Sequence, residues 1–224
     1  MSAPFVVVVT GLQFEARLAH SGNATKVCCG HGTQMAVALA TATGKGCAGI
    51  LSFGIAGGLD PQLRAGAVIV ASSVIGANGV KMALPADERW SQALLRALPQ
   101  AMHAPVLGVD AAVTEPADKL KLFRQTGAAA ADMESHIAAA VAANHGLPFA
   151  VLRVVSDPAS QRIPQVALAG MREGRLDRCD GRAAHTHANA GRSVRSARRC
   201  VQRVCCESGV SARPPRPWRG LRTG

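Results

Sequence analysis

From about residue 4 to residue 157 the chain alternates short runs of apolar, β-branched residues with longer stretches rich in Ala and Leu. Some short runs are apolar without interruption, such as the four consecutive valines at 6–9, which is typical of strands buried on both faces. This alternation predicts an α/β fold in three layers, with a central, mostly buried mixed sheet flanked by helices. The predicted strands cover residues 5–10, 26–29, 48–53, 67–71, 105–109, 128–131 and 149–155.

Four longer segments have the spacing of helices. In the segment 87–98, apolar residues recur at i, i+4, i+7 and i+8 from Trp90, and Asp87 is placed to cap the first turn. Gly146 is placed to end the last helix in a left-handed conformation. The predicted helices cover residues 33–43, 87–98, 117–125 and 134–144.

The alternation of strands and helices ends near residue 170. Residues 171–224 are rich in Arg, Ala, Gly and Cys, without any period and without a helix or strand longer than a few residues. We therefore divide the chain into a domain at 1–170 and a disordered or irregular tail at 171–224. A GC-rich gene read in a shifted frame gives this composition, so one hypothesis is that the tail is out of frame.

The positive charge of the chain is concentrated in this tail. Residues 1–160 carry 11 Lys and Arg against 10 Asp and Glu, whereas residues 161–224 carry 14 Arg against 4 acidic residues. The net charge of +11 is therefore not a property of the predicted domain, and we expect no nucleic-acid partner. Binding of nucleic acid through the tail stays as a weaker alternative. The seven cysteines follow no metal-ligand or disulfide spacing, so we expect reduced thiols and no metal.

No stretch of the sequence has the length and apolarity of a membrane span. The longest stretch without Asp, Glu, Lys, Arg or His, residues 65–80, is interrupted by Ser72, Ser73 and Asn78. The first predicted strand begins at residue 5 without a basic leader before it, so we expect no signal peptide and a cytoplasmic location. No feature of the sequence supports a peripheral membrane contact.

Three segments that can carry chemistry lie at the ends of predicted strands, where open α/β sheets bind their ligands. In the first segment, Gly11 follows a strand and Glu15 comes four residues later. The second comprises two glycine-rich turns at 30–32 and 54–58, whose backbone amides can approach an anion or a sugar closely. Each turn also has a purely structural explanation, because glycine turns after strands commonly serve only to reverse the chain.

The third segment joins two acidic positions. Residues 132–135, with the sequence Asp-Met-Glu-Ser, open a predicted helix, and the last predicted strand leads into Ser156 and Asp157. Glu134 on its own is explained as a favourable charge at a helix start, and Asp157 as the cap of a following helix. The combination of the three segments is more specific than any one of them.

In order and spacing, these segments resemble the nucleoside phosphorylase superfamily, and particularly its purine nucleosidases that act on methylthioadenosine and S-adenosylhomocysteine. The resemblance covers about residues 5–157. Within it, residues 54–58 and 131–135 are most similar to the hopanoid-associated phosphorylases, which release adenine from an adenosyl-hopane precursor. The resemblance implies an enzyme that cleaves the N-glycosidic bond of an adenine nucleoside carrying a 5′ substituent. It implies no cofactor, phosphate as co-substrate if the enzyme is a phosphorylase, and a homodimer.

The resemblance also implies a role for each site residue. Glu134 is expected to accept hydrogen bonds from the ribose hydroxyls, and Met133 to pack on the sugar. Asp157 is expected to protonate the departing purine at N7, with Ser156 orienting it and burial favouring its protonated form. Cleavage builds positive charge on the ribose and negative charge on the base, so an acid at each end fits the chemistry. The other expected substrate-binding residues are Gly11, Gly54, Ala56 and Gly57.

Glu15 bears on the choice between water and phosphate as the nucleophile. In the nucleosidases, an acid four residues after the first glycine orients the attacking water, and Gly11 and Glu15 reproduce that spacing. Phosphorylases carry an arginine in this neighbourhood and a second one near the turn at 54–58, where this chain has Ile55. Because a phosphate site without a cation is electrostatically poor, the sequence favours hydrolysis and leaves phosphorolysis as the alternative.

The chain departs from the family pattern at two places. The nucleosidases stack adenine on an aromatic residue before the helix expected at 117–125, and residues 110–113 include none. The family also has a helix after the position of Asp157 that closes the purine pocket, where this chain has residues 158–171 followed by the Arg-rich tail. A catalytically inactive, ligand-binding remnant of such an enzyme is therefore another alternative.

Overall fold

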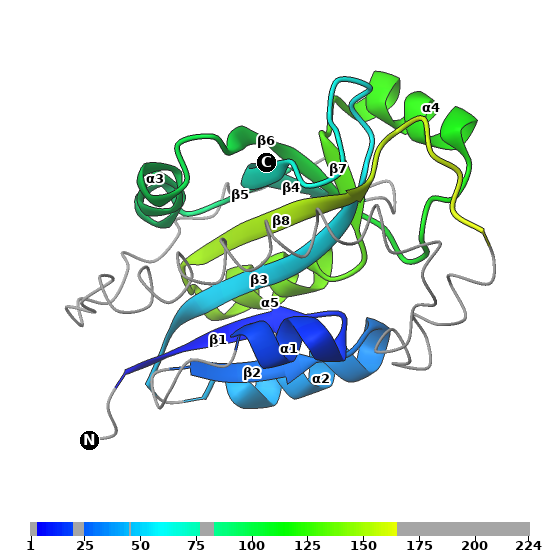
Figure 1. Cartoon of the computed structure of the whole chain (residues 1–224). Helices are drawn as coiled ribbons and strands as arrows, with labels where there is room; N and C mark the ends of the chain where they lie inside the picture. Colours follow the sequence, from blue (N-terminus) through cyan, green and yellow to red (C-terminus); the bar gives the residue numbers. More distant parts are fainter. Residues whose placement is uncertain (1–3, 20–24, 45, 77–82, 165–224) are drawn as a thin grey trace, which may run out of the picture.

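The structure is a computed structural model that describes residues 4–19, 25–44, 46–76 and 83–164, and Figure 1 shows a central sheet with helices packed around it. The predicted tail at 171–224 lies outside the described residues. The strands are β1 (Phe5–Thr10), β2 (Thr25–Cys29), β3 (Cys47–Gly58), β4 (Val68–Gly76), β5 (Leu84–Pro85), β6 (Met102–Gly108), β7 (Ala130–Asp132) and β8 (Phe149–Asp157). The helices are α1 (Gln13–Ala19), α2 (Gly32–Ala42), α3 (Glu88–Ala97), α4 (Pro116–Thr126) and α5 (Ser135–His145).

The sheet is mixed, as the sequence predicts. Its strand order is β2-β1-β3-β7-β6-β4-β5, and β8 pairs with both β3 and β4. The pairs of β3 with β1 and with β8 are parallel, whereas β4 and β8 are antiparallel. Because β1, β3 and β8 run in the same direction, their carboxyl ends at Thr10, Gly58 and Asp157 lie at one edge of the sheet.

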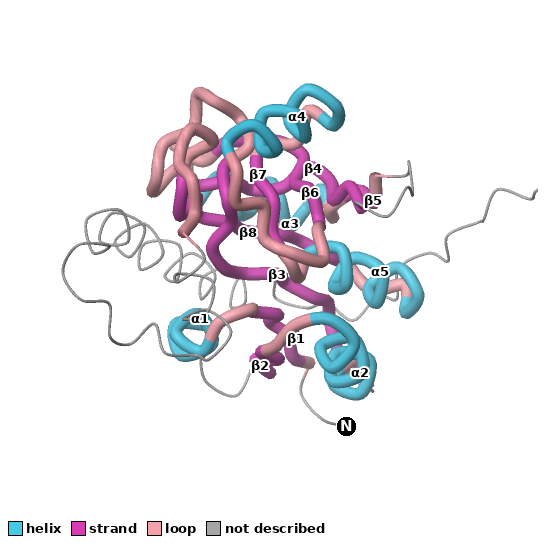
Figure 2. Tube along the Cα trace, turned by 90° about the vertical axis from the view of Figure 1, so that its right-hand side faces the viewer, coloured by secondary structure: helices cyan, strands magenta, loops and turns pink. Residues whose placement is uncertain are grey.

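Both faces of the sheet are covered, which explains the uninterrupted valine run in β1. Val7 and Val9 belong to the core shared with α2 and α5, and Val6 and Val8 to the core shared with α1 and α3. Figure 2 shows α1 on one side of β1 and β2, and α2 and α5 on the other. The predicted three-layer architecture is therefore confirmed, with successive side chains of one strand packed into opposite layers.

Helix ends follow the capping chemistry expected from the sequence. Asp87 caps α3 by accepting a hydrogen bond from the backbone N–H of Trp90 at 3.0 Å. Gly146 ends α5 in the left-handed conformation, with φ of 61°. Gly127 ends α4 in the same way, and Pro116 occupies its first turn, where no intrahelical N–H bond is lost.

The structure corrects three boundaries near the predicted site. Residues 54–58 are not a turn but the last part of β3, because their pairing with β8 continues to Gly57 opposite Asp157. Glu15 lies in α1, a seven-residue helix that the sequence analysis did not predict. Glu134 is the residue before the first turn of α5, in the capping position, rather than within that turn.

A third, smaller apolar core fixes α4 against the end of the sheet. Leu59, Leu107 and Ala131 are buried there, and Leu122 and Phe123 of α4 pack against them. This contact places the first turns of α4 beside the residues that follow β8. Among the residues that the structure describes, none of the helices is both long and apolar enough to cross a bilayer.

We predict that Gly49→Ala destabilises the fold. A Cβ atom at Gly49 would lie 2.7 Å from a ring carbon of Trp90 in α3 and 2.8 Å from the backbone oxygen of Pro148, so backbone has to move. We expect the free energy of unfolding to fall by about 1–3 kcal/mol in chemical denaturation. The control is Gly76→Ala, where no atom of the described residues beyond the chain neighbours lies within 4 Å of the new Cβ and a change within about 0.5 kcal/mol is expected. Equal effects of both variants would contradict this account of the contact between β3 and α3.

Candidate active site

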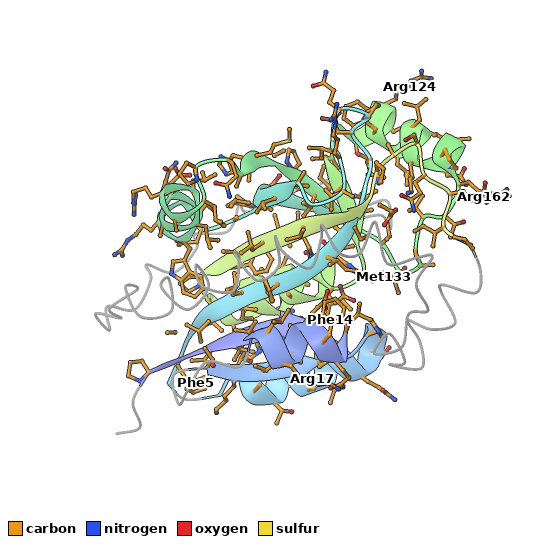
Figure 3. All side chains as sticks on the ribbon, viewed as in Figure 1. Phe5, Phe14, Arg17, Arg124, Met133 and Arg162 are labelled. Atoms are coloured by element: carbon orange, nitrogen blue, oxygen red, sulfur yellow. The ribbon has the colours of Figure 1, made fainter. Side chains whose placement is uncertain are left out.

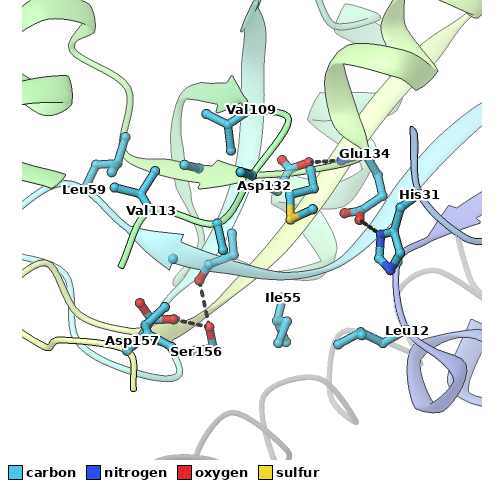
Figure 4. A pocket seen from close by; sticks show the side chains of 18 of the residues that line it. Leu12, His31, Ile55, Leu59, Val109, Val113, Asp132, Glu134, Ser156 and Asp157 are labelled. Atoms are coloured by element: carbon cyan, nitrogen blue, oxygen red, sulfur yellow. Dashed lines mark hydrogen bonds and ion pairs between the residues drawn. The ribbon is translucent and has the colours of Figure 1, made fainter. Parts of the chain in front are cut away.

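The three carboxylates singled out in the sequence lie in one cavity. The cavity has a volume of about 330 Å³ and is lined by Glu15, Glu134 and Asp157, which come from α1, the start of α5 and the end of β8. Figure 4 shows Asp157 with Ser156 at one end of the cavity and Glu134 with His31 at the other. The arrangement therefore offers one acid beside each end of an elongated ligand.

Glu15 is held by backbone amides alone. Its Oε2 accepts hydrogen bonds from the N–H groups of Gly11 (3.0 Å) and Leu12 (2.8 Å), and its Oε1 accepts one from Ile55 (2.7 Å). The side chain is buried, and this burial, together with the negative charge of Glu134, raises the pKa of Glu15 from 4.5 to about 7. Near neutral pH the carboxylate can therefore take up a proton from a bound water.

Three of the predicted glycines make room for these carboxylates. A Cβ at Gly54 would lie 2.5 Å from Oε1 of Glu15, and one at Gly57 would lie 3.3 Å from Oδ2 of Asp157. A Cβ at Gly11 would collide with Oε1 of Glu134. Gly11 and Gly57 line the cavity, but Gly54 does not, so the expected ligand contact of Gly54 is replaced by a contact with Glu15.

Glu134 is set in place by two basic side chains. Nδ1 of His31 donates a hydrogen bond to its Oε1 at 3.0 Å, and this bond raises the pKa of His31, against a smaller, opposite effect of burial. A guanidinium nitrogen of Arg153, Nη2, lies 3.8 Å from its Oε2. Because His31 is partly exposed and lines the cavity, whereas Arg153 is fully buried, only His31 can reach a ligand directly.

Arg153 ties the start of α5 to the sheet. Its Nη2 donates to Oδ1 of Asp132 at 3.1 Å, to the hydroxyl of Ser52 at 2.6 Å and to the hydroxyl of Ser135 at 3.1 Å. Oδ1 of Asp132 also accepts the backbone N–H groups of Glu134 and Ser135. Burial alone would raise the pKa of Asp132, but the guanidinium and these donors hold it below its usual range. This ion pair fixes the backbone from which Glu134 projects.

Asp157 has a partner that the sequence analysis missed. Its Oδ1 lies 2.5 Å from the hydroxyl of Ser156, as the resemblance implies for an orienting serine. Its Oδ2 accepts a hydrogen bond at 2.5 Å from Nζ of Lys119, a lysine in α4 without any exposed surface. The expectation that burial favours a protonated Asp157 did not include this ammonium group, which favours the ionised carboxylate.

The remaining lining is largely apolar. Met133 is half-buried on the wall of the cavity, and Figure 3 shows it in the interior, whereas Arg17, Arg124 and Arg162 project outward. Ala56, another predicted substrate-binding residue, also lines the cavity. None of the lining residues that the structure describes is Phe, Trp or Tyr, which agrees with the lack of these residues at 110–113.

Two functional residues, Arg153 and Lys119, were not found by sequence reasoning. Arg153 had a signal, since it is the single charged residue in the buried segment that leads to Ser156, and a buried charge requires a partner. Lys119 had none, because Lys121 on the same helix has the same local context and is exposed.

Comparisons with known proteins give a consistent result. A family model described as the phosphorylase superfamily matches residues 2–207, and a search of curated proteins finds no match. The fold is similar to that of methylthioadenosine/S-adenosylhomocysteine nucleosidase from Campylobacter jejuni, with a TM-score of 0.71 and 16% identity over 92% of this chain and 100% of that one. Futalosine hydrolase from Helicobacter pylori matches with a TM-score of 0.68 and 13% identity over 92% of this chain and 98% of that one.

We predict that Glu15 makes the fold less stable as the pH rises. Its pKa in the folded chain, about 7, lies above its ordinary value of 4.5, so the folded state binds the proton more tightly. The contribution of Glu15 is therefore complete below about pH 4.5 and lost as the pH rises to about 7, a change of roughly 3 kcal/mol in the free energy of unfolding. Glu15→Gln removes this part of the pH dependence.

The measurement is chemical denaturation of the wild type and of Glu15→Gln between about pH 4 and pH 8. The control is Glu88→Gln, an exposed position at the start of α3, where the difference from wild type is expected to stay nearly constant over this range. A constant difference for Glu15→Gln as well would contradict the elevated pKa.

Proposed function

The chain belongs to the phosphorylase superfamily, and from this premise we propose that it cleaves the N-glycosidic bond of an adenine nucleoside by hydrolysis. The carboxylate of Glu15 in its cage of backbone amides is the observation that carries this proposal. The fold that the chain shares with nucleosidases supports the same proposal.

The amides around Glu15 form a site that would otherwise suit a bound anion. Three N–H groups, from Gly11, Leu12 and Ile55, converge on its two oxygens. A phosphate in this place would lose these donors to Glu15 and would face the negative charges of Glu15 and Glu134. Lys119 is the single lysine or arginine among the described lining residues, and it is paired with Asp157. Water, which is neutral, fits such a site better than phosphate does.

The two ends of the cavity then divide the work of the reaction. At the sugar end, Glu134 accepts hydrogen bonds from the ribose hydroxyls, and its negative charge stabilises the positive charge that develops on the ribose. A water beside Glu15 loses a proton to that carboxylate as it attacks C1′. At the base end, Asp157 faces the purine, and a proton delivered to N7 lets the base leave as a neutral molecule. Met133 packs against the sugar between these ends.

We further propose that the 5′ substituent is apolar, as in adenosyl-hopane. The support is the similarity of residues 54–58 and 131–135 to hopanoid-associated phosphorylases, together with the apolar lining by Leu12, Ile55 and Val113. No lysine or arginine among the described lining residues is free to pair with a carboxylate on the substituent. An apolar substituent therefore fits better than a charged amino-acid tail.

We predict that the products distinguish hydrolysis from phosphorolysis. The full chain is incubated with methylthioadenosine in the presence and absence of inorganic phosphate, and free adenine and the sugar product are quantified. We expect adenine and free methylthioribose, at a rate that phosphate does not change. A sugar 1-phosphate that forms only with phosphate would favour phosphorolysis, and no adenine under either condition would favour the inactive remnant.

We also predict that Asp157→Asn lowers the rate of adenine release by about tenfold or more, because an amide cannot pass a proton to N7. The matched control is Asp118→Asn, an exposed aspartate on α4, for which an unchanged rate is expected. The measurement is steady-state release of adenine by both variants at equal concentrations of folded protein. A wild-type rate in Asp157→Asn would remove this residue from the reaction.

A further inference from the structure

Lys119 carries a buried charge beside Asp157 and has no role in the reaction steps proposed above. Its Nζ donates to Oδ2 of Asp157 at 2.5 Å, to the backbone oxygen of Gln161 at 2.9 Å and to that of Pro158 at 3.3 Å. An ammonium group has three N–H donors and no acceptor, whereas a neutral amine has two donors. Three oxygen partners therefore match the charged form of lysine.

The same contacts describe Asp157 as an ionised group before substrate binds. One of its oxygens accepts a hydrogen bond from this ammonium. The other accepts one from the hydroxyl of Ser156 at 2.5 Å, a shorter contact than the 3.2 Å between the same hydroxyl and the backbone oxygen of Ala56. A carboxylate with a donor at each oxygen is stabilised in its charged form. An ionised Asp157 has no proton of its own to give to a departing purine, so the proton must be held elsewhere.

We propose that Lys119 is a positioning residue that holds Asp157 in place and stores the proton which Asp157 delivers to the leaving purine. This assignment rests on the proposed function and deepens it, because it names the source of the proton at the base end of the cavity. Lys119 acts through Asp157 rather than by contact with the purine.

Every proton in the cleavage step has a donor and an acceptor. As the bond between C1′ and N9 breaks, its electron pair passes to the purine, and N7 takes a proton from Asp157. Asp157 takes that proton from Nζ of Lys119, which becomes a neutral amine. Over the same step the attacking water loses a proton to Glu15. After the products leave, Glu15 releases a proton to solvent and Lys119 regains one, so the cycle needs no other reactant.

Lys119 also has a structural contact, and the test must separate it from the proposed role. The two carbonyls that it binds belong to the segment after β8, which is fixed to the start of α4 by two more contacts. Ile163 donates its N–H to the backbone oxygen of Thr114 at 3.0 Å, and Arg162 forms an exposed ion pair with Glu115 at 2.8 Å. Figure 3 shows Arg162 beside the α4 end of the molecule. Loosening this segment alone can be achieved at Glu115 without a change at Asp157.

Other titratable groups around the cavity can also affect the pH dependence of the rate. On α4 and its cap they are Glu115, Asp118, Lys121 and Arg124, and those lining the cavity from other elements are Glu15, His31, Asp110, Asp132 and Glu134. In a plot of kcat against pH, the rate falls at low pH because Glu15, the proton acceptor, becomes protonated; this is the acidic limb. The rate falls at high pH because the proton at the base end is lost; this is the alkaline limb.

The experiment is the pH dependence of kcat for adenine release from methylthioadenosine by the wild type and by Lys119→Met. In the wild type the base-end proton is held by a lysine and carboxylate pair, whereas in the variant a carboxyl group alone must hold it. Because a carboxyl group loses its proton at a lower pH than a lysine ammonium, the alkaline limb is expected to move down by about one pH unit or more. We also expect kcat at neutral pH to fall about tenfold or more.

Three variants complete the test. Lys121→Met removes an exposed charge from the same helix, Glu115→Gln loosens the segment after β8, and neither is expected to move the alkaline limb. In an Asp157→Asn background, Lys119→Met is expected to cause no further loss of kcat.

The outcomes are distinct. An alkaline limb that stays in place in Lys119→Met, or moves up, overturns the assignment, because Lys119 would then only hold the segment or suppress a protonated Asp157. A wild-type chain that releases no purine overturns the proposed function and this assignment together, whereas purine release with an unmoved limb overturns the assignment alone.

Discussion

The site depends on the balance of four acidic side chains packed around one cavity. Glu15, Asp132, Glu134 and Asp157 are all buried, and an unpaired buried carboxylate is costly enough to be neutralised or to prevent folding. Two fully buried cations balance most of this negative charge. Arg153 lies beside Asp132 and Glu134, and Lys119 is paired with Asp157.

Among the described residues, Glu15 is the one member of this set whose hydrogen bonds all come from neutral donors, although the charge of Arg153 also lowers its pKa in part. Its three hydrogen bonds come from backbone amides, and its nearest charged neighbour among the acids, Glu134, repels it. The difference appears in the acid strengths, because the pKa of Glu15 rises to about 7 while that of Asp132, beside Arg153, lies below its usual range. The same chemical group is thus a proton acceptor in one place and a permanent anion in another.

The sequence was sufficient for the architecture and for the acids, but not for their partners. The strand at 5–10 and the end of α5 at Gly146 follow from local pattern and capping, which act over a few residues. The contact of Lys119 with Asp157 joins positions 38 residues apart, and no local feature distinguishes this lysine from Lys121. Because glycine commonly ends strands, the sequence predicts a turn at 54–58, whereas in the structure glycine lets β3 pass close to Glu15 and Asp157.

That close passage explains how a sheet edge can hold three acids. At Gly11, Gly54 and Gly57 the missing side chains leave the space that Glu134, Glu15 and Asp157 occupy. An internal carboxylate in the amide cage remains at fixed distance from the sugar end, whereas a diffusing anion would have to displace it and leave it buried without donors. The cost of that displacement, more than any single residue type, is the physical support for our proposal that water is the nucleophile.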